Sequence, residues 1–129
     1  MRIPKPTDGE LAILAVLWQR GASTVRQVFE VLNEEREVGY TTVLKLLQIM
    51  TEKGLVDRDD SERTHVFSAR HSEELTQRGL VQDLLDRAFG GSSMKLVMQA
   101  LATRKASPED LAAIRKMLMK AEAGAEVHR

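Results

Sequence analysis

The side chains best suited to chemistry lie close together near residue 40. Hydroxyl, amide and amino groups gather there on Tyr40, Thr41, Thr42, Lys45 and Gln48. In a helix over residues 40–54, Thr41, Lys45 and Gln48 share one face, opposite an apolar stripe. Threonine methyl groups can contact thymine, while lysine and glutamine can hydrogen-bond base edges or phosphate. The pattern is typical of a DNA recognition helix and also of an ordinary solvated helix face, so the neighbouring elements decide between the two.

The sequence contains no catalytic or metal-binding pattern. Its histidines, His65, His71 and His128, fall on a predicted hairpin, a linker and the tail, at spacings that match no metal-ligand motif. Cysteine is absent, which excludes thiolate catalysis and thiolate metal sites. Gly90 and Gly91 lack the Gly-Lys-Ser/Thr ending of a phosphate loop and indicate the end of a helix instead. We therefore expect no enzyme activity, no metal and no cofactor.

Two further helices are predicted before the segment at residue 40. Thr7 and Glu10 form a capping-box pattern at the start of the first helix, which ends at Gly21. Thr24 and Gln27 repeat the pattern at the start of the second helix. The candidate recognition helix comes third, as it does in three-helix variants of the helix-turn-helix.

A hairpin is predicted next, from two β-capable runs over residues 55–58 and 64–68. Three helices followed by a hairpin predict a winged helix-turn-helix in residues 1–71. Arg58 and Arg63 would contact the DNA backbone from this wing. The acidic turn between the runs would repel phosphate, so we expect the tip to point away from DNA or Arg63 alone to reach it.

Residues 72–129 are predicted to form three amphipathic helices, with start signals at Ser72, Ser92 and Ser107. Three such helices leave apolar surface uncovered, and a twofold partner would bury it. We therefore expect a homodimer, with a monomer whose helices fold back on the first domain as the alternative. The expected interface residues are Leu75, Leu80, Val81, Leu84, Leu85, Phe89, Leu96, Val97, Leu101, Leu111, Ile114 and Leu118. The predicted fold class is mainly α with a small β-hairpin: a winged helix-turn-helix plus a C-terminal helical dimerisation arm.

Composition agrees with a small helical protein. The 129 residues are 43% hydrophobic but only 4% aromatic, so the core must be aliphatic. No apolar run approaches 18 residues and the N-terminus does not resemble a signal peptide, so we expect a cytoplasmic protein without membrane insertion. Lys plus Arg equals Asp plus Glu, at 19 each. A DNA-binding protein of this composition must gather its positive charge on one face.

Five short stretches follow one another in a distinctive order between Thr7 and Leu118. They are residues 10–18, 40–43, 53–56, 89–92 and 107–111. In this order and spacing the chain resembles the penicillinase repressor family (BlaI and MecI, with the copper-responsive CopY repressors as relatives). The resemblance implies a dimeric repressor whose winged helices bind palindromic operators of resistance or stress genes. It also implies that the three C-terminal helices form the dimer interface.

Members of this family respond to two known inducing signals, and the residues that each signal requires are missing from this chain. In β-lactam-responsive members, a membrane sensor-protease partner triggers cleavage in the fifth helix, which here would fall at Gln99 and Ala100. Those members have an Asn-Phe pair at that point, which this chain lacks. CopY-type members sense metal through a cysteine pair, also absent here. The wing has Glu62 where a glycine is usual.

The sequence thus predicts a homodimeric, sequence-specific repressor of transcription whose partner is a double-stranded DNA operator. We expect Thr41, Thr42 and Lys45 to face bases. Contacts to phosphate or sugar are expected from Tyr40, Gln48, Arg58 and Arg63. Two alternatives stay open: a winged-helix protein-interaction module that binds no DNA, and a ligand-sensing regulator with a pocket between arm and wing. Steep weakening of binding with salt would distinguish a DNA-binding protein from an interaction module.

Overall fold

A computed structural model describes residues 3–127 of the chain. It contains two compact units, Met1–Leu84 and Leu85–Arg129. Helix α4 (Glu73–Ala88) runs from the first unit into the second. The predicted domain boundary after residue 71 assigns all of α4 to the C-terminal half, and it stays a prediction.

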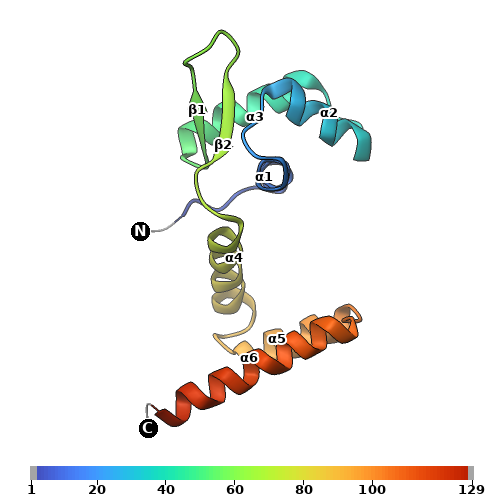
Figure 1. Ribbon diagram of the computed structural model, residues 1–129, viewed down its shortest axis with the longest axis vertical. Coiled ribbons are helices and arrows are strands. Elements are labelled where there is room, and N and C mark those ends of the chain that lie inside the picture. The colour runs from blue at the N-terminus through green and yellow to red at the C-terminus, as the bar shows by residue number, and fades with distance from the viewer. Residues whose placement is uncertain (1–2, 128–129) are drawn as a thin grey trace. The chain divides into compact units, whose positions relative to one another are not determined.

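Three helices build the winged-helix part of the first unit (Figure 1), and capping boxes mark where the first two begin. They are α1 (Asp8–Arg20), α2 (Val25–Glu35) and α3 (Tyr40–Lys53). The Thr7 hydroxyl accepts from the Glu10 backbone N–H, and the Glu10 carboxylate accepts from the Thr7 N–H. Thr24 and Gln27 make the same reciprocal pair at α2, so both predicted capping boxes are confirmed.

The hairpin consists of β1 (Val56–Asp59) and β2 (Val66–Ala69), paired antiparallel with Val56 opposite Ala69. Both strands begin one or two residues later than the sequence predicts. Ser23, just before α2, exchanges two backbone hydrogen bonds with Phe67 of β2. β1 contacts α3 and β2 contacts α1, so the hairpin is fixed to the helices at its base.

The core of this unit is almost entirely aliphatic, as composition predicts. Each of the three helices contributes a buried stripe, and the hairpin base closes the core from the side. The buried apolar side chains are Ile13, Leu14, Val16, Leu17, Val25, Val28, Leu32, Val43, Leu47, Met50, Leu55, Val56 and Phe67. This core holds α3 with its opposite face free.

Helix α4 is joined to the winged helix by specific contacts within the first unit. The Trp18 indole N–H donates to the His71 backbone carbonyl at 3.0 Å. Ser72 caps the helix by accepting from the Leu75 N–H, and Thr76 is buried. Lys5 forms a 3.0 Å salt bridge with Asp83. Helix α4 is therefore held by α1 at its start and by the N-terminal segment at Asp83.

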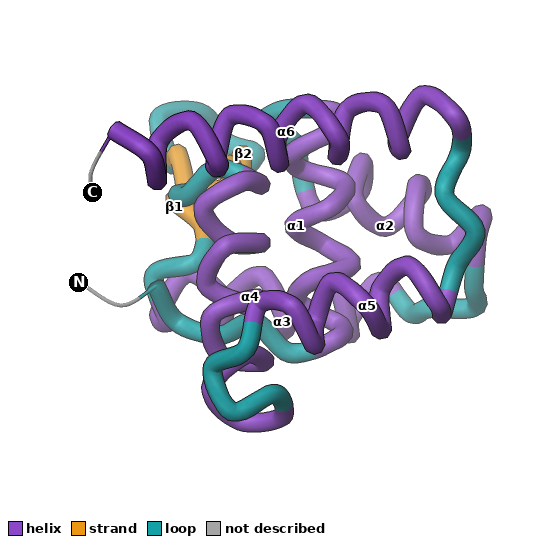
Figure 2. The backbone as a smooth tube through the Cα atoms, turned by 90° about the horizontal axis from the view of Figure 1, so that it is seen from below, coloured by secondary structure: helices purple, strands orange, loops and turns teal. Residues whose placement is uncertain are grey.

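The second unit has little that could stabilise it alone. After two glycines with positive φ, Gly90 and Gly91, it contains α5 (Ser93–Thr103) and α6 (Pro108–Val127). Figure 2 shows them as two rods joined by a short loop. No side chain between residues 85 and 125 is buried. Within residues 3–127, no helix combines the length and apolar character needed to cross a membrane.

Candidate nucleic-acid interface

Helix α3 presents a polar face opposite its core stripe. Thr41, Thr42, Lys45 and Gln48 are all exposed. On the other side Val43, Leu47 and Met50 are completely buried, because their spacing of four and three residues returns them to one face of the helix. The helix starts after Gly39 without a side-chain cap, so its first backbone N–H groups are not used by a capping side chain.

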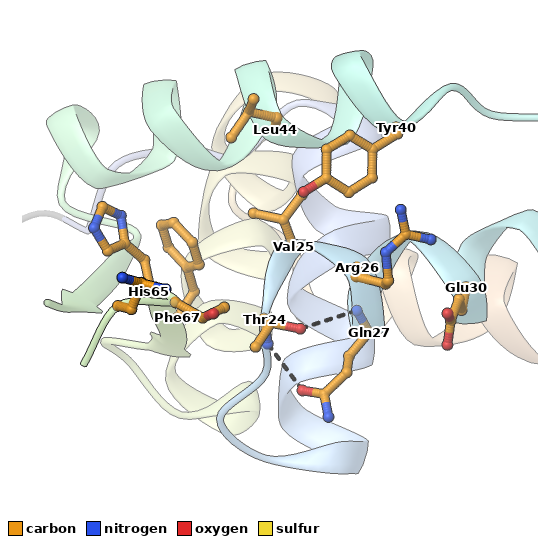
Figure 3. Close-up of a pocket in the computed structure, with 11 residues that line it drawn as sticks. Thr24, Val25, Arg26, Gln27, Glu30, Tyr40, Leu44, His65 and Phe67 are labelled. Carbon is orange, nitrogen blue, oxygen red and sulfur yellow. Dashed lines mark hydrogen bonds between the residues drawn. The ribbon is translucent and has the colours of Figure 1, made fainter. Parts of the chain in front are cut away.

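An open groove lies beside the start of α3, between α2 and the hairpin. Figure 3 shows its lining, with Tyr40 and Arg26 close to one another and His65 on the hairpin side. We call it the α2–wing groove, and its lining residues are Thr24, Val25, Arg26, Gln27, Glu30, Tyr40, Leu44, Arg63, Thr64, His65 and Phe67. Arg63 and Tyr40, two of the predicted DNA-contacting residues, are thus brought to the same groove.

Salt bridges to carboxylates neutralise some basic side chains of the first unit and leave others unpaired. They join Lys53 to Glu10, Arg58 to Asp60, Arg70 to Asp57, Lys5 to Asp83 and Arg78 to Glu74. Among residues 3–84 the exposed basic side chains outside such pairs are Arg20, Arg26, Arg36, Lys45 and Arg63. Arg26 and Arg63 line the α2–wing groove, and Lys45 lies on the exposed face of α3. A neutral chain therefore still presents unpaired positive charge around the start of α3.

Several charged side chains at the tip of the wing interact with other groups of the same tip. The Arg58 guanidinium lies 2.8 Å from Asp60, and His65 Nε2 is 3.6 Å from the same carboxylate oxygen. The Ser61 backbone N–H donates to Asp59 at 2.9 Å, and this hydrogen bond lowers the pKa of the Asp59 carboxyl. Arg58, predicted to contact phosphate, is thus already paired on the hairpin, whereas Arg63 is not.

Tyr40 and Arg26 form a stacked arrangement that the sequence did not suggest. The Tyr40 ring meets Phe29 edge to face at 5.8 Å, and the Arg26 guanidinium lies 5.2 Å from the centre of the Tyr40 ring. Arg26 was not among the predicted site residues. Its place in the first turn of α2, two residues after the Thr24 cap, was the available signal, because helix N-termini attract phosphate.

A buried ion pair fixes the far end of α3 to the start of α1. Glu10 is only 2% exposed, and its carboxylate lies 2.6 Å from the Lys53 ammonium. Burial alone would raise the pKa of Glu10, but the hydrogen bonds from Lys53 and Thr7 and the lysine charge outweigh it, so the pKa is lowered. Because Lys53 is the last residue of α3, this pair helps to set the angle at which α3 presents its polar face.

The predicted interface residues of the helical arm are incompletely covered. Leu75, Val81, Leu84, Val97, Leu101, Leu111 and Leu118 are exposed, and Leu80, Leu85, Phe89, Leu96 and Ile114 are half-buried. Four further large side chains of the arm are exposed but were not among the expected interface residues: Met94, Met98, Met117 and Met119. Gln99 and Ala100, the candidate cleavage residues, are exposed on α5. Cleavage there and the membrane sensor-protease partner stay predictions.

The histidines are not gathered into a site. His65 belongs to the wing, His71 precedes α4, and His128 lies outside the described residues. Across residues 3–127 no three acidic or histidine side chains cluster closely enough to hold a metal ion.

Comparison with known proteins identifies the family. The sequence profile described as penicillinase repressor matches residues 6–120. The chain belongs to the penicillinase repressor family. It is 34% identical over 118 residues to the transcriptional regulator BlaI of Mycobacterium tuberculosis, covering 91% of this chain and 85% of that protein. The penicillinase repressor of Bacillus licheniformis is 21% identical over 110 residues, covering 85% of this chain and 86% of that protein.

Solved structures agree on the fold of this family member. The solution structure of the DNA-binding domain of the repressor BlaI matches with a TM-score of 0.50 and 23% identity, over 57% of this chain and 90% of that one. The complex structure of hsRosR-S4 matches with a TM-score of 0.53 and 18% identity, over 95% of both chains. The winged-helix fold class is confirmed. Family membership also makes the chain a transcriptional regulator and not an enzyme, as predicted.

Proposed function

We propose that this chain represses transcription as a homodimer that binds an operator with two half-sites. Residues 1–71 would form the DNA-binding domain and residues 72–129 the dimerisation domain. In each protomer α3 would enter the major groove, with Thr41, Thr42 and Lys45 facing base edges. Gln48 and Arg63 would contact the phosphate and sugar backbone.

The observation that carries this proposal is the distribution of unpaired charge. Salt bridges join Asp60 to Arg58, Asp57 to Arg70 and Glu10 to Lys53. The basic groups left over include Arg26, Lys45 and Arg63, beside an exposed polar helix face. A phosphate backbone is attracted to such a group of positive charges.

The helical arm supports a second copy of this chain as the partner. Between residues 85 and 125 no side chain is buried, so α5 and α6 have no core of their own. Their exposed apolar side chains include Met94, Val97, Met98 and Leu101, which recur at intervals of three and four along one stripe of α5. A twofold interface would cover such stripes on both copies at once. Homodimers of this kind also match dyadic operators.

Selection of bound sites from a random duplex pool tests the DNA-binding part of the proposal. We expect an enriched palindrome whose half-sites lie about one helical turn apart. Binding to the recovered duplex should weaken steeply as salt rises. Absence of enrichment, with weak binding lost at moderate salt, would instead favour a winged-helix module that binds proteins.

Sedimentation of the Leu84→Asp variant tests the dimer. Leu84 is 45% exposed in the single chain, so a charge there costs little in the monomer and much in an apolar interface. We expect the dimer and operator binding to weaken together. Gln77→Asp, on an exposed position of the same helix, is the matched control. A stable Leu84→Asp dimer would place the interface elsewhere.

A further inference from the structure

The α2–wing groove contains a contact between Arg26 and Tyr40 that is not part of the hydrophobic core. Arg26 is exposed and could pair with Glu30, which lies one helical turn later and lines the same groove. No salt bridge to Arg26 is formed within residues 3–127. Its guanidinium lies over the Tyr40 ring instead, 5.2 Å from the ring centre, as Figure 3 illustrates.

The Tyr40 ring is itself held in place. It is 39% exposed and packs edge to face on Phe29, with 74° between the ring planes. Phe29 is half-buried on α2 and packs against the core. Because an aromatic face attracts a cation without neutralising it, Arg26 keeps its full charge while losing part of its freedom. This arrangement preorganises a phosphate-binding group before any DNA arrives.

We propose that Tyr40 is a positioning residue whose ring holds Arg26 in the α2–wing groove, where Arg26 and Arg63 bind the phosphate backbone of the duplex. The inference rests on the proposed function, since it assigns phosphate-binding residues to that DNA interface. It differs from the sequence-based expectation, in which Tyr40 contacts phosphate or sugar directly. The phenolic hydroxyl is then dispensable, and the ring is not.

Salt-dependent binding of four single variants, one double variant and a control tests the inference, with the selected duplex and a scrambled duplex of equal length as probes. Each phosphate contact contributes about 0.9 to the slope of log affinity against log salt. Arg26→Ala should therefore lower the slope by about 0.9 on both duplexes. Arg26→Lys should keep the slope but bind more weakly, because a lysine stacks less well on the ring. Tyr40→Phe should match the parent protein.

Tyr40→Leu should lose part of the affinity that Arg26→Ala loses, because the guanidinium keeps its charge but is no longer held by the ring. In the double variant, Tyr40→Leu should add little to the loss from Arg26→Ala, because it acts through Arg26. Arg20→Ala, an exposed arginine at the end of α1 outside the groove, is the matched control and should leave the slope unchanged. Additive losses from Arg26→Ala and Tyr40→Leu, or an unchanged slope in Arg26→Ala, would overturn the inference.

Two further outcomes separate the inference from the proposed function. Weakened binding by Tyr40→Phe would show that the hydroxyl itself contacts DNA, which overturns the positioning role but leaves the repressor function standing. Parent protein that binds neither duplex in a salt-dependent way would overturn the proposed function and this inference together. If Tyr40→Leu is misfolded by circular dichroism, an unchanged slope in Arg26→Ala, weakened binding by Tyr40→Phe or parent-like affinity of Arg26→Lys still overturns the inference.

Discussion

Removing the cation from the buried Glu10–Lys53 pair should destabilise the winged helix. The two charged groups lie 2.6 Å apart, and Glu10 is 2% exposed. At an effective dielectric constant of about 20, their attraction is roughly 6 kcal/mol before the cost of burying Glu10 is counted. Breaking a fully buried pair costs about 3–5 kcal/mol. Since the Lys53 side chain is 33% exposed, water can partly replace it, and we expect Lys53→Met to cost about 2 kcal/mol.

A double-mutant cycle in urea separates the pair from its surroundings. Glu10→Gln keeps an oxygen that can accept from the Thr7 N–H but removes the charge, so we expect it to cost about 1–2 kcal/mol. The double variant should be less destabilised than the sum of the single variants by about 1 kcal/mol or more. All midpoints must be compared at one protein concentration, because the stability of a dimer depends on it.

The exposed pair of Arg78 and Glu74 supplies the control for this cycle. Its side chains are 70% and 81% exposed, so Arg78→Met should change stability by less than about 0.5 kcal/mol. If Lys53→Met is as mild as Arg78→Met, or if the two changes at the buried pair are simply additive, the argument that this contact anchors α3 is refuted.

The same structure makes three further predictions. The pKa of Glu10 is lowered from its ordinary value of 4.5. The stabilisation from the charged Glu10 is therefore present above that pH and is lost as the pH falls through the lowered pKa. In urea titrations, the difference in stability between the parent protein and Glu10→Gln should shrink on acidification below about pH 4.5. Lys45→Ala should cost about 1–3 kcal/mol of binding to the selected duplex and relax sequence preference if Lys45 reads a base, and unchanged affinity and preference would remove it from the base contacts. Gly54→Ala should destabilise the protein by about 1–2 kcal/mol, because the φ of +82° at this position is strained for alanine. The Arg70 guanidinium, 2.9 Å from the added Cβ, can move aside and adds little to this cost. A neutral effect on thermal unfolding would contradict this prediction.

Local signals were enough to place most element ends. Capping boxes such as Thr7 with Glu10 involve residues three apart, and the glycine at position 54 stops α3 through its own backbone conformation. The exposed face of α3 followed from periodicity alone. The start of the first strand did not, because Leu55 is apolar and was assigned to that strand. It is buried just before β1, in the core beneath α3.

The sequence by itself determined the fold class and the face of α3 that is free to contact DNA, because helical periodicity and capping depend on residues a few positions apart. Only the tertiary structure decided which charges remain available. Lys53 meets a carboxylate 43 residues earlier, and Arg70, just after β2, pairs with Asp57 of β1. Arg26 instead rests on the ring of Tyr40. Such pairings depend on distances between side chains of different elements, which packing of the core fixes and sequence spacing does not reveal.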